Sequence, residues 1–388
     1  MRRVKLGQIC EVVSGGTPKT NVEEYWNGEF NWITPAEIND NDYIISDTKR
    51  KITQLAIEKK KLPLLPKGTV LLSSRAPIGK VAITGKEMYC NQGFKNLICS
   101  DEICNEYLYW YLKSKKEYLN SLGRGATFKE ISKKIVENIE IKLPEIERQR
   151  KIVDKLKKVD KIIQRKKNQS RLLDVVVQAR FVEMFGDPVQ NTKGWSIDTC
   201  KNLTSKIGSG ATPKGGRESY CTEGIAFVRS MNVYNNRFEY GDLAFINDEQ
   251  ANKLSNVMVQ HKDVLLNITG ASVARCCIVP DELIPARVNQ HVAIVRCKEK
   301  ILPEFLCSMF TEDNYQKLLW RIATSGGATR EAITKQQIEN LVLIVPPMKL
   351  QEDYVRFSER VNKSKFEIQK SLEKTQLLFD SLMQEYFG

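Results

Sequence analysis

At 388 residues the chain is long enough for two or three domains, each able to bury a core of its own. A hydrophobic fraction of 41% and a charged fraction of 28% are ordinary for a globular protein, which argues against a largely disordered chain. The 60 lysines and arginines exceed the 47 acidic residues, and the net charge of +13 favours a polyanionic partner, most often nucleic acid. The alternative is that lysine-rich, solvated helix faces account for the excess.

The residue pattern argues against a membrane-spanning helix, against disulfide bonds and against a metal site. The longest apolar runs, such as 341–345, fall far short of the roughly 18 residues that a membrane span requires, and no signal segment precedes residue 15. The ten cysteines include one adjacent couple, Cys276 and Cys277, but no C-x-x-C pair, so we expect small buried hydrophobic side chains. His261 and His291 have no cysteine at ligand spacing. We therefore expect a cytoplasmic protein without cofactor or metal.

Short strands and short helices alternate in both halves of the chain. Segments rich in residues that suit a pleated surface, bounded by Gly, Pro or Asn, predict strands in the first half at 30–34, 69–73, 80–84 and 96–99. Two helices should follow, over 106–122 and over 127–137, the second with Thr127 as a candidate cap. The second half predicts strands at 225–229, 263–268, 275–279 and 292–297. Each half is therefore expected to be α+β.

Each half ends in a long helix that a proline turn introduces. No glycine or proline interrupts the chain between Pro144 and Gly186, and apolar residues recur there at steps of three and four or their multiples. That seam consists of Ile152, Leu156, Val159, Ile163, Leu173, Val177 and Met184, and only Lys166 and Ser170 interrupt it. After Pro346 and Pro347 a second such face comprises Leu350, Tyr354, Phe357, Val361, Ile368, Leu378 and Leu382. Both faces predict helices that pair with a partner helix.

The two halves are copies of one unit, because five features return in the same order about two hundred residues later. The segment 14–19 returns as 209–214, and the strand start 70–72 returns as 264–266. The remaining pairs are 91–92 with 289–290, 125–127 with 327–329, and Pro144 followed by Gln149 with Pro346 followed by Gln351. If the two long helices pair, the second must run back toward the first domain. We therefore expect two tandem similar domains, an antiparallel coiled coil about 60 Å long, and a pseudo-two-fold, circular arrangement.

Enzymatic motifs are missing from the sequence. No G-x-x-x-x-G-K-[ST] phosphate loop, G-x-S-x-G elbow, H-E-x-x-H helix or G-x-G-x-x-G loop occurs, and no Asn-Pro-Pro-aromatic segment of an adenine methyltransferase is present. With only two histidines, acid-base catalysis would depend on carboxylates or lysines. We expect no catalysis by this chain alone.

The duplicated Thr-Pro-Lys loop is a candidate phosphate contact. Thr17 and Lys19 in the first copy, and Thr212 and Lys214 in the second, follow glycine or small residues whose backbone amides can approach a phosphate. A plain tight turn before a strand is the alternative. Because the motif occurs in both copies while its flanks differ, we favour a functional loop.

Basic and amide side chains follow predicted strands in both copies. Arg is the common bidentate reader of guanine and Asn of adenine, so different residues at equivalent places predict two different short sequences. The candidates are Arg75, Lys80, Gln92 and Lys95 in the first copy and Arg229, Asn267, Thr269, Arg275, Gln290 and His291 in the second. Solvated loop charge is the alternative for the basic residues, and a structural role is the preferred alternative for His291.

Glycine-rich segments with a basic residue precede helix starts in both copies. Their candidate DNA contacts are Arg124, Thr127 and Lys129 in the first copy and Thr329 and Arg330 in the second. Helix N-termini favour anions such as backbone phosphates, although a threonine cap explains the threonines equally well. The long helix is also basic over 148–171, which is either the solvated face of a coiled coil or a surface over DNA between two half-sites.

Together these motifs resemble the specificity (S) subunits of type I restriction-modification systems. The resemblance covers essentially the whole chain and is carried by the duplicated, ordered series: 6–7 with 16–18, 71–73 with 78–80, 91–93, Pro144 with Gln149, and the echoes of these in the second half. It implies a non-catalytic reader of double-stranded DNA with two target recognition domains, each reading one half of an asymmetric bipartite site. The helices then set the spacer and dock two modification (methyltransferase) subunits. The resemblance also implies restriction subunits that add ATP-driven translocation and cleavage.

The resemblance implies four parts: a first target recognition domain over 1–144, a central helix over 145–186, a second target recognition domain over 187–346, and a C-terminal helix over 347–388. Two alternatives remain. The chain could be part of a single-chain restriction-methylation enzyme, or a coiled-coil scaffold for protein partners without DNA binding.

Overall fold

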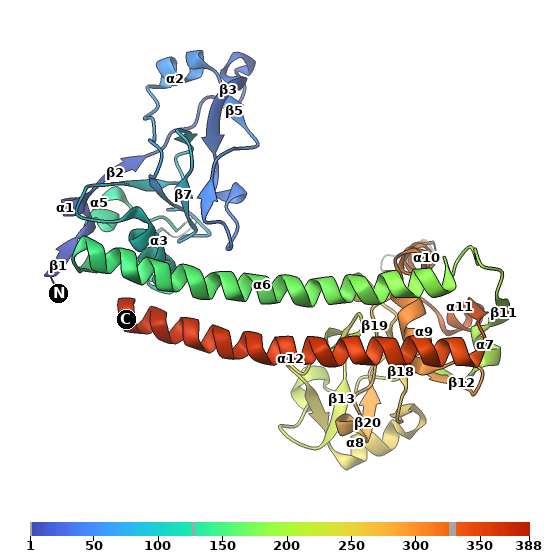
Figure 1. Cartoon of the computed structure of the whole chain (residues 1–388). Coiled ribbons are helices and arrows are strands. Elements are labelled where there is room, and N and C mark those ends of the chain that lie inside the picture. The colour runs from blue at the N-terminus through green and yellow to red at the C-terminus, as the bar shows by residue number, and fades with distance from the viewer. Residues whose placement is uncertain (1, 126–128, 326–330) are drawn as a thin grey trace. The chain divides into compact units, whose positions relative to one another are not determined.

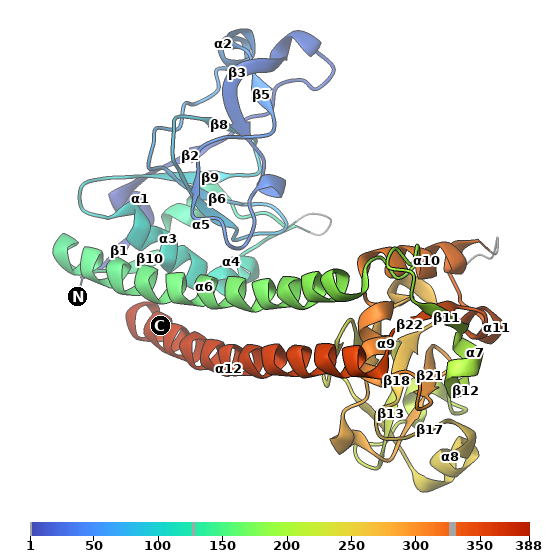
Figure 2. The ribbon, with the colours of Figure 1, turned by 45° about the vertical axis from the view of Figure 1, so that its right-hand side comes forward.

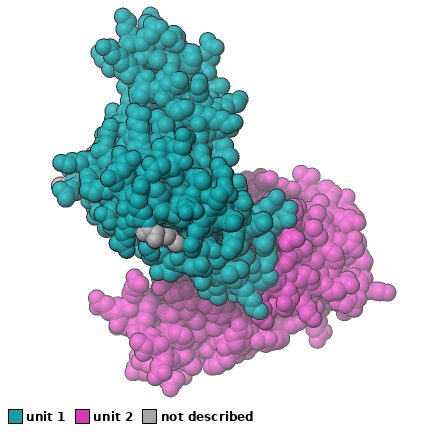
Figure 3. Space-filling model, turned by 60° about the vertical axis from the view of Figure 1, so that its left-hand side comes forward, with its two compact units in different colours: residues 1–166, 371–388 teal, residues 167–370 magenta. Residues whose placement is uncertain are grey.

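The protein divides into two compact units in the computed structural model, which describes residues 2–125, 129–325 and 331–388 (Figure 3). Unit 1 consists of Met1–Lys166 and Ser371–Gly388, and unit 2 consists of Lys167–Lys370. Each unit therefore contains one part of each long helix. Each also has hydrophobic cores made of its own residues.

Unit 1 contains short strands and helices between its N-terminus and the first long helix (Figure 1). Its strands are β1 (Arg2–Lys5), β2 (Cys10–Ser14), β3 (Trp26–Ile33), β4 (Ile44–Ile45), β5 (Lys51–Ile52), β6 (Val70–Leu72), β7 (Val81–Thr84), β8 (Tyr89–Cys90), β9 (Lys95–Cys99) and β10 (Glu140–Leu143). Its short helices are α1 (Leu6–Ile9), α2 (Gln54–Lys60), α3 (Asn105–Ser114), α4 (Lys116–Ser121) and α5 (Lys133–Glu137).

Unit 2 repeats this organisation after the first long helix. Its strands are β11 (Ser196–Thr199), β12 (Thr204–Ser209), β13 (Ile225–Val228), β14 (Val233–Tyr234), β15 (Arg237–Phe238), β16 (Ala244–Ile246), β17 (Met258–Val259), β18 (Val264–Asn267), β19 (Cys276–Ile278), β20 (Ala286–Val288), β21 (Val292–Cys297) and β22 (Val342–Val345). Its short helices are α7 (Cys200–Leu203), α8 (Asp248–Lys253), α9 (Pro303–Phe310), α10 (Asp313–Thr324) and α11 (Lys335–Glu339). All eight strands predicted from the sequence are confirmed, with ends that differ by a few residues.

Sheet topology confirms the duplication. The main sheet of unit 1 has the order β2-β9-β6-β7-β4, and that of unit 2 has the order β12-β21-β18-β19. A smaller sheet in each unit pairs two strands in parallel, β3 with β8 in unit 1 and β13 with β20 in unit 2. The strands that flank each unit also pair, β1 with β10 and β11 with β22. The repeat in the sequence is therefore also a repeat of strand order and strand pairing.

The central strand of each main sheet is buried on both faces, which explains its unbroken apolar run. In β6, Val70 and Leu72 join the core that contains α3, whereas Leu71 joins the core under the smaller sheet. In unit 2, Val264 and Leu266 of β18 face one core, and Leu265 faces the other. Figure 1 and Figure 2 both show α3 between the main sheet of unit 1 and the first part of the long helix.

The long helices are α6 (Ile146–Phe185) and α12 (Met348–Phe387), each of 40 residues, as the sequence predicted. Helix α6 ends before Gly186, whose φ of +74° suits glycine. The two helices run antiparallel within each unit. In unit 1 the Nζ of Lys166 donates to the hydroxyl of Thr375 at 2.9 Å, and in unit 2 Lys365 forms an ion pair with Asp174.

The predicted seam residues of α6 are buried or half-buried, although Phe181 and Phe185 complete the seam and were not predicted. Lys166 interrupts the seam without leaving an unpaired charge against apolar surface, since hydroxyls of α12 accept its hydrogen bonds. On α12 one prediction is wrong, because Leu378 is 53% exposed. Its neighbour Phe379 packs against Trp110 instead, so Phe379 rather than Leu378 lies on the inward face of α12.

Two buried glutamines explain why Pro144 with Gln149 recurs as Pro346 with Gln351. In unit 1 the side chain of Gln149 accepts from Cys104 N at 2.8 Å and donates to Glu102 O and Pro144 O, both at 2.9 Å. In unit 2 Gln351 accepts from Leu302 N at 2.9 Å and donates to Lys300 O and Pro346 O. Each glutamine thus joins the first turn of a long helix, through hydrogen bonds, to the loop that follows the last strand of the main sheet. Neither glutamine is exposed to solvent.

Two predicted helices are shorter than expected. The helix over 106–122 divides at Lys115, where the backbone (φ −100°, ψ 18°) leaves the helical region, into α3 and α4. The helix over 127–137 begins only at Lys133, because Ser132 caps it by accepting from Ile135 N. Thr127, the predicted cap, lies outside the described residues.

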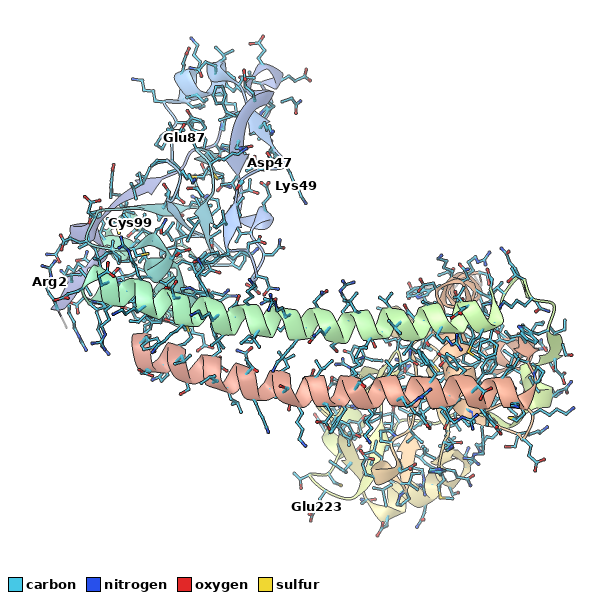
Figure 4. All side chains as sticks on the ribbon, in the orientation of Figure 1. Arg2, Asp47, Lys49, Glu87, Cys99 and Glu223 are labelled. Atoms are coloured by element: carbon cyan, nitrogen blue, oxygen red, sulfur yellow. The ribbon has the colours of Figure 1, made fainter. Side chains whose placement is uncertain are left out.

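All ten cysteines are free, and Cys10, Cys90, Cys200, Cys276, Cys277 and Cys307 are buried. Cys99 of β9, labelled in Figure 4, is half-buried. Its partner in the strand pair is Cys10 of β2. These positions confirm the prediction of small hydrophobic side chains for the six buried cysteines. In the described parts of the chain, no helix is long and apolar enough to cross a membrane.

Candidate nucleic-acid interface

The loop over 14–19 in unit 1 lies against the Asn-Gln segment that follows β8. Gly16 N donates to Cys90 O at 2.9 Å, and a Cβ on Gly15 would lie 2.1 Å from Asn91 O, so only glycine allows this approach. The indole N–H groups of Trp32 and Trp26 hold the other side of the loop by donating to Gly16 O and Lys19 O, at 3.0 and 3.2 Å. This loop is therefore fixed in place, with the Lys19 side chain exposed.

Unit 2 builds a similar contact from its own copy of the loop, with a register that differs by one residue. Gly210 N donates to Asn289 O at 3.0 Å, and a Cβ on Gly210 would lie 1.7 Å from Val288 O. In both units the asparagine side chain accepts from the backbone two residues later: Gly93 N donates to Asn91 Oδ1, and His291 N donates to Asn289 Oδ1. Two motifs that are about eighty residues apart in each copy are thus one structural element.

Three predicted residues of unit 1 converge around a glutamate that was not predicted. Glu130 Oε2 accepts from Arg75 Nε at 2.9 Å, and Glu130 Oε1 accepts from Lys95 Nζ at 3.1 Å. The backbone groups of Arg124 and Glu130 also pair, at 2.9 and 3.1 Å. Partial burial raises the pKa of the Glu130 carboxyl, but the hydrogen bonds from Arg75 and Lys95 outweigh it, so the net shift is downward. We call Arg75, Lys95 and Glu130 the Glu130 cluster.

Four predicted residues of unit 2 form a chain of uncharged hydrogen bonds. Thr212 Oγ1 donates to Gln290 Oε1, and Gln290 Nε2 lies 3.2 Å from His291 Nε2. His291 Nδ1 lies 2.5 Å from Thr269 Oγ1. The chain is consistent if Gln290 donates to Nε2 and His291 carries its proton on Nδ1. We call Thr212, Gln290, His291 and Thr269 the His291 chain.

The Glu130 cluster and the His291 chain occupy corresponding places in the two copies. In unit 1, Ser74 N donates to Gly93 O, and Ile131 N donates to Ser74 O. In unit 2 the same pair of bonds joins Ile268 N to His291 O and Ile333 N to Ile268 O. Arg75 and Thr269, the residues that follow Ser74 and Ile268, are therefore structural counterparts.

Other predicted residues form bonds within their own unit. Lys80 Nζ donates to Pro35 O and Ile38 O, at 3.1 and 2.7 Å, and Asn267 is fully buried with its amide donating to Ser230 O at 2.8 Å. Arg229 donates to Asp242 O and lies over the ring of Tyr220, and Arg275 lies 4.3 Å from the centroid of the Tyr234 ring. These contacts give each residue a structural role, and DNA contact by them stays a prediction.

The remaining predicted residues divide by exposure. Thr17 and Thr212 are half-buried, whereas the side chains of Lys19, Gln92, Arg124, Lys129, Lys214 and Gln290 are exposed. Thr127, Thr329 and Arg330 lie outside the described residues. Sequence reasoning missed Glu130 and the pair Trp26 and Trp32. In unit 2 Ala332 occupies the place of Glu130, so the sequence repeat carries no signal for Glu130.

The chain matches the family model described as Type I restriction modification DNA specificity domain over residues 1–171 and 194–377. It is 33% identical over 379 residues to the MjaIX specificity subunit of a type I restriction enzyme from Methanocaldococcus jannaschii, with 90% of this chain and 84% of that subunit covered. The MjaVIII specificity subunit from the same organism is 22% identical over 366 residues, with 90% and 83% covered.

Two solved structures share the fold. The S subunit of a type I restriction-modification system from M. genitalium has a TM-score of 0.60 and 14% identity, with 100% of this chain and 96% of that chain covered. A chain from a structure on complex assembly and conformational transition of the type I system has a TM-score of 0.61 and 18% identity, with 100% and 97% covered. At these identities the likeness concerns the fold alone.

Proposed function

This chain belongs to the family of type I restriction-modification specificity subunits, and we propose that each of its units reads one half of an asymmetric, bipartite site in double-stranded DNA. The observation that carries the proposal is the pair of clusters at corresponding places of a duplicated fold. One fold used twice offers two similar ways to approach DNA, whereas different side chains at the reading positions select different bases. The charge of +13 supports a polyanionic partner.

Phosphate contacts and base contacts fall to different residues in this proposal. The exposed side chains of Lys19, Arg124, Lys129 and Lys214 are assigned to backbone phosphates, which position the protein without reading sequence. Thr127, Thr329 and Arg330 belong to the glycine-rich segments that would add such contacts. Arg75 in unit 1, and Gln290 with its neighbours in unit 2, are assigned to base edges.

The two long helices are proposed to pair as an antiparallel coiled coil that sets the spacer between the half-sites. In each unit the inward residues of α6 and α12 recur at steps of three and four, which supports this packing. A helix of 40 residues is about 60 Å long, comparable with the length of one to two turns of B-DNA at about 34 Å each. With this pairing the chain has four parts, over 1–144, 145–186, 187–346 and 347–388, in a pseudo-two-fold, circular arrangement.

Two modification subunits are proposed to dock on the long helices and nearby surfaces. Helix α6 exposes four apolar side chains whose spacing places them on one face of the helix. They are Leu172, Val175, Val176 and Val182, each 45–47% exposed. Exposed apolar side chains of this spacing suit a partner helix or groove. The chain itself is proposed to be non-catalytic, with adenine-N6 methylation and ATP-dependent cleavage carried by modification and restriction subunits in the cytoplasm.

Methylome sequencing of cells that express this chain with its cognate modification subunit tests the proposal. A single asymmetric motif with two defined half-sites and an undefined spacer is the expected result. Methyl transfer by the purified chain alone would instead support a restriction-methylation enzyme. Binding of protein partners without any DNA selection would support a coiled-coil scaffold.

A further inference from the structure

We infer that Glu130 is a positioning residue that aims Arg75 at the O6 and N7 acceptors of one guanine in the half-site read by unit 1. The inference rests on the proposed DNA-reading function, and it adds the base that Arg75 reads and the residue that orients Arg75. The feature that suggests it is a carboxylate held between two cations on a surface otherwise suited to a polyanion.

The guanidinium of Arg75 uses its Nε to bond Glu130, and its two terminal nitrogens are available to a ligand. Its Nε donates to Glu130 Oε2 at 2.9 Å, and the side chain is 44% exposed. Among the described residues, neither terminal nitrogen of Arg75 forms a hydrogen bond or ion pair. Because the guanidinium is rigid and planar, holding Nε fixes the direction in which the terminal nitrogens point. Arg75 therefore presents donors whose orientation is set before DNA binds.

Glu130 is itself held firmly enough to serve as this support. Its second oxygen accepts from the largely buried Lys95, whose Nζ also lies 3.5 Å from Ser74 Oγ. Its backbone N–H and C=O both pair with Arg124. Two cations and one carboxylate leave a net charge of +1 in the cluster, so Glu130 reduces but does not remove its attraction for an electron-rich partner.

A guanine explains this arrangement better than a phosphate does. A phosphate contact depends mainly on positive charge, and a carboxylate beside the arginine would weaken it. Base reading depends on direction, because two parallel donors match guanine O6 and N7, whereas Asn and Gln match adenine. The counterpart of Arg75 in unit 2 is the uncharged Thr269, which lies in the His291 chain. The position that corresponds to Arg75 in unit 2 therefore offers no arginine to a guanine.

The test uses the complex of the full chain with its modification subunits and DNA that carries the methylome-defined site. Each guanine of the half-site read by unit 1 is replaced in turn by 7-deazaguanine, which lacks the N7 acceptor but still pairs with cytosine. For the wild-type chain, one replacement should weaken binding about 10-fold. In Arg75→Ala the same replacement should change binding less than about twofold. Arg75→Lys retains the charge and a donor but not the planar fork, so the replacement should weaken its binding less than it weakens that of the wild-type chain.

Glu130→Gln tests the positioning role, with Glu137→Gln as the matched control. Glu137 carries the same charge in the same unit, has a similarly exposed side chain (36% against 33%), and pairs only with Lys133 among the described residues. Glu130→Gln should raise affinity for non-specific DNA about threefold by removing a negative charge, yet lower the specific-to-non-specific ratio about 10-fold. Glu137→Gln should leave that ratio within about twofold of wild type.

Three outcomes would overturn the inference while leaving the proposed function intact. One is a unit 1 half-site without guanine on either strand. A second is Arg75→Ala weakening binding to all sequences equally and reducing the salt slope by about one, as a phosphate contact would. The third is an unchanged ratio in Glu130→Gln. A wild-type complex without sequence preference would contradict the proposed function itself.

Discussion

The Glu130 cluster of unit 1 and the His291 chain of unit 2 occupy the same place in one duplicated fold but differ in chemistry. The first joins two cations to one carboxylate, and the second joins hydroxyl, amide and imidazole groups without a formal charge. The backbone hydrogen bonds beneath them are equivalent. In this protein the main-chain pairing is thus retained between copies, while the side chains that it displays are not.

The loops over 14–19 and 209–214 show the same separation. Both place a glycine against a backbone carbonyl of the Asn-Gln element. In unit 1 two tryptophans hold the far side of the loop, and Arg50 lies 3.9 Å above the Trp26 ring. In unit 2 the threonine of the loop bonds directly to Gln290. The shared contact requires glycine, whereas its support can be built from different residues.

The largest expected effect is a change of one half-site when one unit is exchanged. Replacing residues 1–144 by the corresponding part of another specificity subunit should replace the half-site read by unit 1, because the side chains of the other unit are untouched. Methylome sequencing of the chimaera measures the outcome. The reciprocal exchange of 187–346 serves as the control. A change in both half-sites from either exchange would contradict separate reading by the two units.

Lengthening the paired helices should change the length of the spacer and leave the sequences of the two half-sites unchanged. Seven residues inserted between 166 and 167, together with seven between 370 and 371, add two helical turns to each helix and keep the seam in register. The added length of about 10 Å corresponds to about two to three base pairs. The methylated motif reports spacer and half-sites together. An unchanged spacer would count against the proposed role of the helices.

Loss of either buried glutamine should destabilise its own unit by a similar amount. Gln149→Ala leaves Cys104 N and two carbonyls unpaired, and Gln351→Ala does the same at Leu302 N, so each should lower the free energy of unfolding by about 3 kcal/mol. Urea unfolding measures both. Gln178→Ala, an exposed position on α6, should stay within about 0.5 kcal/mol of wild type. A cost no larger than that of the control would contradict a structural role.

The smallest expected effect concerns the duplicated lysines. Lys19→Ala should weaken binding to all sequences and flatten the dependence of log affinity on log salt by about one unit, since it removes one phosphate contact. Lys214→Ala should do the same from unit 2, because both lysines are exposed on equivalent loops. Affinity measured between low and moderate salt, on specific and random DNA, checks both variants. A selective loss on the specific sequence would show that these lysines read bases.

Local patterns made much of the fold predictable. The apolar period of α6 and α12, the proline turns before them and Gly186 after α6 depend on neighbouring residues, so the helices are where the sequence predicts them. Leu378 shows the limit of such counting: an error of one position moves a side chain from the inward face to solvent, although Leu382, four residues later, packs as predicted. The helix predicted over 127–137 begins later than expected, at Lys133, because Ser132 caps it.

The sequence by itself determined the duplication, the long helices and the small set of loops that carry the candidate residues, because order and periodicity are properties of the chain. Only the tertiary structure decided which of those residues meet. Glu130 reaches Arg75 across 55 positions through an isolated backbone bridge, and Thr212 reaches Gln290 across 78 through the pairing of β12 with β21. A strand pairing shifted by one residue would separate either pair, since alternate side chains face opposite sides of a sheet. For that reason Arg75 was predictable as a candidate, whereas its support by Glu130 was not.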